Sequence, residues 1–357
     1  MFICDTHSDS LMRMIDLSYT LEDERLQVSL PKMKGGGHDL QVFACFIDPA
    51  VGRERYISRT LQMIDLLRTE VNRHRKQIAL CASSKEIKSA RAKKKKIALL
   101  GIEGGHAIAN DLSILRCYRQ LGIIYMTLTW SNTNDWADSS SDEERWGGLT
   151  QFGQEVVREM NRIGMMVDIS HVSDKTFWQT LRLSTKPLIA SHSSTRTLCK
   201  HHRNLSDEMI KAMTEKGGVV FINFYPAFLN QSFSEANDKL RRRLQKRIDT
   251  AASRWGTRKE MYTYEEEKIL RGFVQSLPEV KLEDAVRHIV HTARIAGVES
   301  VGFGSDFDGI PFSPNGLNDC TAFPGLCEAL RKKGFKPSEV RKIAGENFLR
   351  VFDEVVG

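Results

Sequence analysis

Two short strings in this sequence combine histidine with carboxylates at a spacing suited to metal binding. Residues 5–9 read Asp-Thr-His-Ser-Asp, and residues 167–171 read Val-Asp-Ile-Ser-His. Each string follows an apolar run that is typical of a buried β-strand. Imidazole nitrogens and carboxylate oxygens are ligands for zinc and similar divalent ions. We therefore expect His7, Asp9 and His171 to be metal ligands.

Three further candidates follow other apolar runs: Glu103 before Gly-Gly-His, His192 within Ser-His-Ser-Ser, and Asp306 within Gly-Ser-Asp-Phe-Asp-Gly. Histidines and carboxylates without thiolates suit an open, catalytic site. Six candidates exceed the needs of one tetrahedral ion, whereas two ions sharing a carboxylate would use them. The predicted chemistry is metal-assisted hydrolysis, in which a metal-bound hydroxide attacks and a carboxylate such as Asp306 moves the proton.

Eight apolar or β-branched runs alternate with stretches of helical periodicity, such as 152–163. This alternation predicts an α/β protein, a (β/α)₈ TIM barrel, in which the candidate ligands meet at the carboxyl ends of the strands. A doubly wound sheet is the alternative. The predicted strands are 2–4, 41–46, 97–101, 123–129, 165–169, 188–190, 219–223 and 301–304.

Two segments depart from the minimal alternation. One is the polar stretch 131–148, and the other is 228–277, which is rich in Arg, Lys and Glu. The second follows the seventh predicted strand, on the side where barrel active sites lie. We expect residues 1–357 to form a single barrel hydrolase domain with a helical insertion over 228–277. Whether this insertion is a lid or a charged surface helix is open.

Composition narrows the classes of partner and location. The net charge is +7, and the basic residues come in bursts without the aromatic residues that stack on bases, so we expect no nucleic-acid partner. No apolar run reaches the length of a membrane span. The seven cysteines are scattered and odd in number, which favours reduced thiols. The first strand begins almost at Met1, leaving no room for a signal peptide. We therefore expect a cytoplasmic protein.

Each candidate also has a purely structural interpretation. A histidine at a strand end is commonly a hydrogen-bonding structural group, and Glu103 between glycines could cap a helix. Asp5, Asp168 and Asp308 fit turn or supporting roles and are left out of the ligand set. The combination of His, Asp and Glu at five of the eight predicted strand ends favours the metal site.

The sequence resembles the membrane (renal) dipeptidase family of metal-dependent barrel hydrolases. Matching strings occur in order along nearly the whole chain, which makes them specific together. They are residues 5–9, 103–106, 136–138, 148–153, 167–173, 191–194, 203–205, 217–225 and 304–309.

The resemblance implies a dipeptidase with two Zn²⁺ ions and a homodimeric assembly. His7 and Asp9 would bind one ion, and His171 and His192 the other, with Glu103 bridging both. Two further residues complete the implied machinery. Asp306 matches the catalytic acid/base carboxylate of the family, and Arg203 matches the arginine that binds the free carboxylate of the substrate. Family members often accept a D-residue at the C-terminal side, so L,D-dipeptides are expected substrates.

Two positions depart from the family pattern. Where many members have histidine after the fourth strand, in Leu-Thr-His, this sequence has Trp130, whose indole donates one hydrogen bond and does not titrate. An aromatic position after strand seven that is tyrosine in the mammalian enzyme is Phe228. Both residues are predicted to contact substrate, and both put substrate preference in doubt.

Two other functions remain open. One is a different barrel amidohydrolase that acts on a cyclic amide, lactone or phosphoester. Such enzymes often bridge their metals with a carboxylated lysine after strand four, but residues 125–130 contain no lysine. The other is a barrel that has lost catalysis and serves as a binding protein. The presence of all six candidate residues argues against this second function.

Overall fold

The computed structural model describes residues 1–258 and 260–357 and contains one sheet of parallel strands. Eight strands follow one another around the sheet in the order β1-β2-β4-β5-β6-β7-β8-β9, and β3 pairs with the first residues of β4. The bounds are β1 Cys4–Ser8, β2 Leu40–Phe46, β3 Ile78–Leu80, β4 Lys96–Glu103, β5 Ile123–Thr127, β6 Met166–Asp168, β7 Ile189–Ala190, β8 Val219–Ile222 and β9 Val301–Phe303.

The sheet curves into a nearly closed barrel, as predicted. Closure between the first and last strands is made just beyond β9, where the Asp306 amide donates to the His7 carbonyl at 3.1 Å and the Asp9 amide donates to the Phe307 carbonyl at 2.9 Å. All eight predicted strands are present, with ends shifted by at most four residues. β3 was not predicted, and β1 ends at Ser8 where residue 4 was expected, so that Asp5 and His7 lie within the strand.

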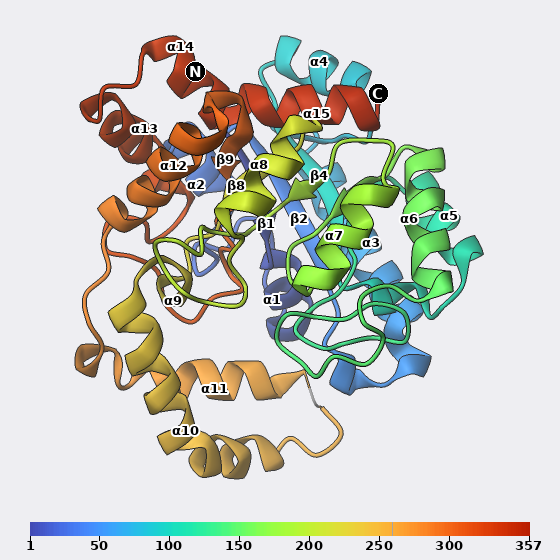
Figure 1. The fold of residues 1–357 in the computed structure, drawn as a ribbon, viewed down its shortest axis with the longest axis vertical. Helices are drawn as coiled ribbons and strands as arrows, with labels where there is room; N and C mark the ends of the chain where they lie inside the picture. The colour runs from blue at the N-terminus through green and yellow to red at the C-terminus, as the bar shows by residue number, and fades with distance from the viewer. Residues whose placement is uncertain (259) are drawn as a thin grey trace.

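Helices cover the outside of the barrel, and the α10–α11 pair projects beyond one end of it (Figure 1). The predicted helix 152–163 is α6, and Ser206 caps α8 by accepting from the Met209 amide. The bounds are α1 Ser10–Leu17, α2 Leu30–Gly35, α3 Tyr56–Arg73, α4 Ser84–Ala92, α5 Leu112–Gln120, α6 Gln151–Ile163, α7 Asp174–Leu183, α8 Asp207–Glu215, α9 Pro226–Leu229, α10 Gln231–Ser253, α11 Met261–Arg271, α12 Leu282–Ala296, α13 Phe323–Lys332, α14 Pro337–Arg341 and α15 Asn347–Val355.

The strands are buried on both faces, which explains their nearly continuous apolar sequences. Alternate residues of β4 pack into different cores: Ile97 and Leu99 belong to the smaller cluster with α15, and Ala98 and Leu100 to the larger one under the other helices. Gly101 leaves room for the ring of Tyr125 on β5, because a Cβ there would lie 2.4 Å from the Tyr125 Cζ. A tyrosine thereby fits beneath the candidate site.

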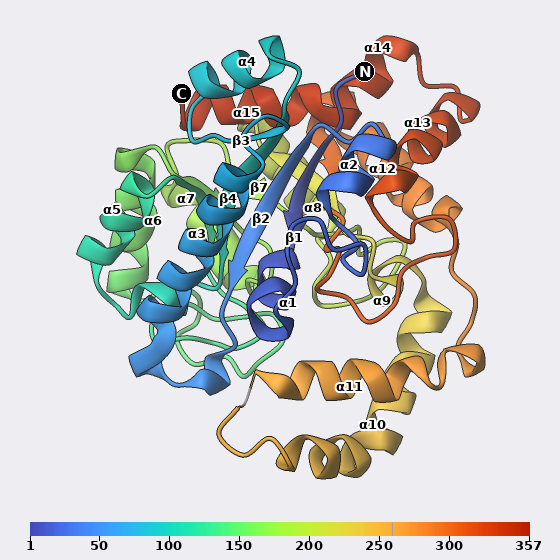
Figure 2. The same ribbon diagram turned by 180° about the vertical axis from the view of Figure 1, so that it is seen from behind.

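Helices α10 and α11 occupy most of segment 228–277 and lie beyond the end of the barrel toward which the β2 arrow points (Figure 2). The chain termini and α4, α14 and α15 lie at the opposite end (Figures 1 and 2). The insertion therefore stands on the side of the barrel where the strands end. Among the described residues, no helix combines the length and apolar character that crossing a membrane requires.

Candidate metal centre and its cavity

The structure brings the six predicted residues together at the carboxyl ends of five strands. Five of the side chains are buried and that of Asp306 is half-buried, and they include two groups whose ligand atoms lie within 4.8 Å of one another. One group is His7, Glu103 and His192, and the other is His7, Asp9 and Asp306. His7 therefore belongs to both groups, and each group could hold a metal ion.

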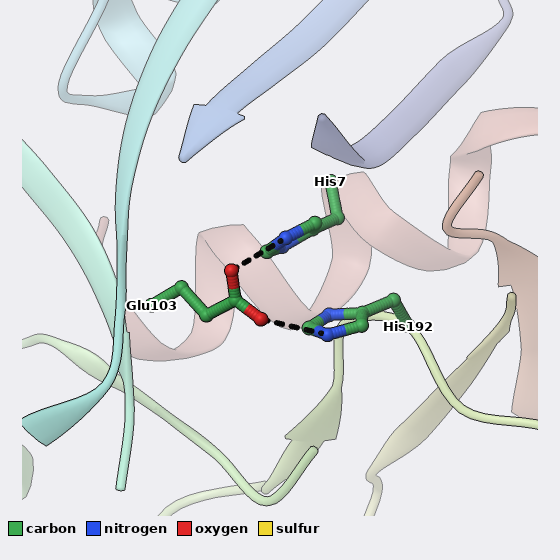
Figure 3. A group of neighbouring side chains, drawn as sticks. All are labelled: His7, Glu103 and His192. Atoms are coloured by element: carbon green, nitrogen blue, oxygen red, sulfur yellow. Dashed lines mark ion pairs between the residues drawn. The ribbon is translucent and has the colours of Figure 1, made fainter. Parts of the chain in front are cut away.

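Glu103, at the end of β4, lies between three histidines. Its Oε2 is 3.5 Å from the His7 Nε2, and its Oε1 is 2.8 Å from the His171 Nε2 and 3.3 Å from the His192 Nε2. Figure 3 shows the two carboxylate oxygens directed toward His7 on one side and His192 on the other. This arrangement suits a bridging carboxylate.

Tyr125 orients the ring of His7. The Tyr125 hydroxyl donates to the Thr6 carbonyl at 3.0 Å, so it accepts from the His7 Nδ1, 2.9 Å away. With its Nδ1 bonded to Tyr125, the ring directs its Nε2 toward Glu103 and Asp9. A hydrogen bond of this kind at the outer nitrogen is the usual support of a metal-binding histidine.

His192 is oriented by a chain of hydrogen bonds that begins at Asp168 of β6 and passes through Ser191. The Ser191 hydroxyl donates to the Asp168 Oδ2 at 2.5 Å and lies 2.7 Å from the His192 Nδ1, from which it accepts. The His192 Nε2 therefore faces the site, only 3.0 Å from the Nε2 of His171. His171 itself has a left-handed backbone, with φ at 72°, a conformation that is uncommon outside glycine and clusters at functional sites.

The donor atoms of this cluster fit divalent cations. The His7 Nε2 and the Asp9 Oδ1 are buried without a hydrogen-bond partner among the described residues. Two imidazole nitrogens at 3.0 Å repel one another if both present lone pairs, unless a cation or proton lies between them. Nitrogen and carboxylate oxygen donors without thiolate suit zinc and related ions.

Burial and mutual contact shift the acidities in the cluster. Burial by itself would raise the pKa of Glu103, but the positive charge of His7 and the neighbouring imidazoles of His171 and His192 lower it well below its usual range. Burial, reinforced by Glu103, raises the pKa of Asp9 to about 6. Burial, assisted by Arg203, lowers the pKa of His171 to about 4. Glu103 is therefore a carboxylate and His171 a neutral ring at neutral pH.

Asp306 lies beside this cluster at the end of β9. Its Oδ2 accepts from the Asn223 side-chain amide at 2.9 Å. Burial, together with the negative charge of Asp9, raises its pKa well above the usual range. Gly309 keeps the loop close to the site, because a Cβ there would lie 2.0 Å from the Asp9 Oδ2 and 2.6 Å from the Asp306 Oδ1.

The cluster opens into a cavity of about 500 Å³. The wall includes the predicted contact residues Arg203, Trp130 and Phe228 and five residues of α10 and α11, so the helical insertion forms part of the cavity. Apolar side chains such as those of Met12, Phe46 and Ile310 form another part of the cavity wall. The lining residues from the barrel side include Asp9, Met12, Phe46, Glu103, His171, Tyr225, Asp306 and Ile310, and those from the insertion are Arg241, Tyr262, Thr263, Glu266 and Glu267.

Arg203 is a buried cation within this wall. Its Nη1 donates to the Ser193 hydroxyl at 3.3 Å and its Nη2 to the His192 carbonyl at 3.1 Å, while the Nε has no partner among the described residues. Its guanidinium lies 5.4 Å from the centre of the Phe228 ring. Burial lowers the pKa of Arg203 to about 10, so the group remains charged at neutral pH. It can bind an anion that enters the cavity.

Trp130 packs against Phe46, with ring centres 4.8 Å apart, and lies 6.5 Å from the ring of His171. The indole therefore forms an apolar part of the wall where the family pattern has a titratable ring.

Several supporting residues were not identified from the sequence. Tyr125 appears there only as one residue of an apolar strand, and the chain of hydrogen bonds through Ser191 depends on contacts between neighbouring strands. Asp5, Asp168 and Asp308, which were set aside as supporting residues, all accept hydrogen bonds near the site. Asn223 belongs to one of the matching strings, but its contact with Asp306 joins two segments that are distant in the chain.

Fold and site together define a metal-dependent barrel hydrolase. The model of the family "Membrane dipeptidase (Peptidase family M19)" matches residues 1–356, so the chain belongs to this family of metallo-dipeptidases.

Three solved structures illustrate the likeness. The dipeptidase AC, a metallopeptidase of family M19, is 26% identical with a TM-score of 0.81, and the match covers 100% of this chain and 99% of that one. A metallopeptidase from Rhodobacter sphaeroides, liganded with a phosphinate mimic of L-Ala-D-Ala, is 25% identical with a TM-score of 0.80 over 99% of both chains. The probable dipeptidase PvdM from Pseudomonas aeruginosa, 23% identical with a TM-score of 0.85 over 99% and 95%, shares the fold.

Proposed function

We propose that this protein is a dizinc dipeptidase that hydrolyses dipeptides with a free C-terminal carboxylate, including L,D-dipeptides. The proposed ligands are His7 and Asp9 for one ion and His171 and His192 for the other, with Glu103 bridging them. The observation that carries the proposal is the position of Glu103, whose two oxygens face different histidines. We further propose that residues 1–357 form one catalytic domain, with 228–277 as its helical insertion, and that the protein acts as a homodimer.

The donor atoms of the cluster support two divalent ions. Asp9, Glu103 and Asp306 supply carboxylates, and His7, His171 and His192 supply imidazole nitrogens, which is more than one tetrahedral ion needs. When bound, the two ions would activate a water molecule and polarise the scissile carbonyl.

The residues of the chain orient the substrate. Arg203, buried and with an unused donor, would bind the free carboxylate of the dipeptide, because a guanidinium forms paired hydrogen bonds with a carboxylate. Phe228, which lies beside Arg203, and Trp130, which lies near His171, would contact the substrate from the cavity wall. The mimic of L-Ala-D-Ala bound by the Rhodobacter relative supports a substrate with a D-residue at the C-terminal position.

Asp306 would move the proton during the reaction. Its elevated pKa allows it to take a proton from the attacking water and pass it to the amine of the leaving residue. Asn223 would hold its carboxylate in place through the 2.9 Å hydrogen bond.

The test is metal analysis of the purified protein together with a panel of dipeptides that carry L and D residues at each position. We expect two zinc ions per chain and hydrolysis of dipeptides, with each free acid turned over in strong preference to its C-terminal amide. Arg203→Gln should reduce this preference and leave metal content unchanged. A protein without zinc that hydrolyses no dipeptide would overturn the proposal. Turnover of a lactone or cyclic amide in its place would favour the other amidohydrolase function.

A further inference from the structure

Arg13 is a nearly buried cation with no part in the reaction described above. It lies on α1, one turn after Asp9, and 13% of its side chain is exposed. Its Nε donates to the Asp308 carbonyl at 2.6 Å, and its Nη2 donates to the Glu267 carboxylate at 2.7 Å. A buried guanidinium needs partners, and here the two partners belong to different parts of the molecule.

The first partner belongs to the loop that carries Asp306. Both Asp306 and Asp308 have left-handed backbones, with φ at 62° and 69°. This region is unfavourable for a residue with a side chain, so surrounding contacts must impose it. The Asp308 carboxylate accepts from the Ser10 hydroxyl at 2.6 Å and from the Gln27 amide at 2.9 Å. Arg13 adds a charged donor to the contacts that hold this loop.

The second partner belongs to α11, which forms part of the cavity wall. Glu267 lines the cavity and also pairs with the exposed Arg271 at 2.6 Å, through its other oxygen. A neighbouring residue of the same helix, Tyr264, donates to the Asp16 carboxylate of α1 at 3.1 Å. Helix α1 therefore contacts both the Asp306 loop and the insertion.

We propose that Arg13 is a positioning residue that fixes the Asp306 loop and the α10–α11 insertion relative to one another. Its bond to Asp308 holds the loop in the shape that directs Asp306 toward Asp9. Its bond to Glu267 holds α11 in the cavity wall. The kinetic consequences rest on the proposed function, with the first bond governing kcat and the second governing KM.

Three variants separate the two bonds. Arg13→Gln removes both bonds, and Glu267→Gln weakens only the bond between Arg13 and the insertion. Arg271→Gln is the matched control, because it removes an ion pair of Glu267 that does not reach the barrel.

We expect Arg13→Gln to keep both metals and to lower kcat by about tenfold or more, since small displacements of a catalytic group have effects of this size. Glu267→Gln should raise KM severalfold with kcat within about twofold of the parent value. Arg271→Gln should change neither.

Amide hydrogen exchange tests the same link without activity. Arg13→Gln should speed amide exchange both in residues 305–309 and in α11. Glu267→Gln should speed amide exchange in α11 alone. If Arg13→Gln does not fold, Arg13→Lys replaces it, because a single ammonium cannot reproduce the two-sided contact. Exchange and kinetics equal to the parent, or loss of metal from the Arg13 variant, would overturn the inference. A parent protein without dipeptidase activity would count against the proposed function, and exchange would still decide the role of Arg13.

Discussion

At the scale of single residues, the site depends on side chains that hold other side chains in place. Tyr125 determines which nitrogen of His7 is free, and Ser191 does the same for His192. Asp306 lies close enough to His7 and Asp9 to share an ion with them. Its two conceivable roles, proton carrier and ligand, can be separated by a substitution that preserves shape.

We predict that Asp306→Asn keeps both metals and lowers kcat by about 10²- to 10⁴-fold, because an amide cannot accept and return a proton. Metal content and dipeptide turnover of the same preparation provide the measurement. Asp48→Asn is the control, since Asp48 lines the same cavity outside the cluster and should change kcat little. A metal-free Asp306 variant would instead make Asp306 a ligand.

At the scale of elements, the barrel positions the site through close packing between neighbouring strands. Gly101 on β4 faces the ring of Tyr125 on β5, and that ring reaches His7 on β1. The position of His7, a proposed metal ligand, thus depends on a glycine that lies two strands away. Loss of space at this position should affect stability and metal binding together.

We expect Gly101→Ala to reduce the free energy of unfolding by about 1–3 kcal/mol, because the added methyl overlaps the Tyr125 ring. Zinc affinity should also fall as the ring moves away from His7. Thermal unfolding with and without added zinc measures both effects. Gly325→Ala within α13 is the matched control: nothing lies within 4 Å of its added Cβ, and it should be neutral or slightly stabilising. A Gly101 variant that behaves like this control would contradict the prediction.

The barrel and the ligand cluster were predictable because parallel strands bring their carboxyl ends to one rim, wherever His7, Glu103 and Asp306 lie in the chain. The matching strings added the specific family. The position of α10 and α11 was not predictable, because their charged sequence fits equally well a solvated helix and a cavity wall. The contact between Tyr125 and His7 was also not predictable from the sequence, because it joins residues that are far apart in the chain.

At the scale of the whole molecule, several histidines are buried as neutral groups, and this makes stability depend on pH. His38 has its Nε2 2.7 Å from the Leu40 carbonyl, and burial lowers its pKa to about 3. The unfolded chain binds this proton near pH 6.5 and the folded chain does not. The stability contribution is therefore complete above pH 6.5 and is lost progressively as the pH falls toward 3.

Chemical denaturation between pH 7 and 4 should show the free energy of unfolding decreasing on acidification, with His38 contributing up to about 1.4 kcal/mol per pH unit. In His38→Gln the slope should be smaller by this amount, whatever the absolute stability of the variant. An unchanged slope would mean that His38 is already protonated in the folded protein.

Both chain ends lie at the end of the barrel opposite to the α10–α11 insertion (Figures 1 and 2). The carbonyl of Gly357 even accepts from the Ser84 amide, at the start of α4. A tag, fused domain or solid support attached at either terminus would approach from the end of the barrel opposite the insertion. Immobilised molecules would then present their cavities outward, which makes the protein suited to display on a surface without loss of substrate access.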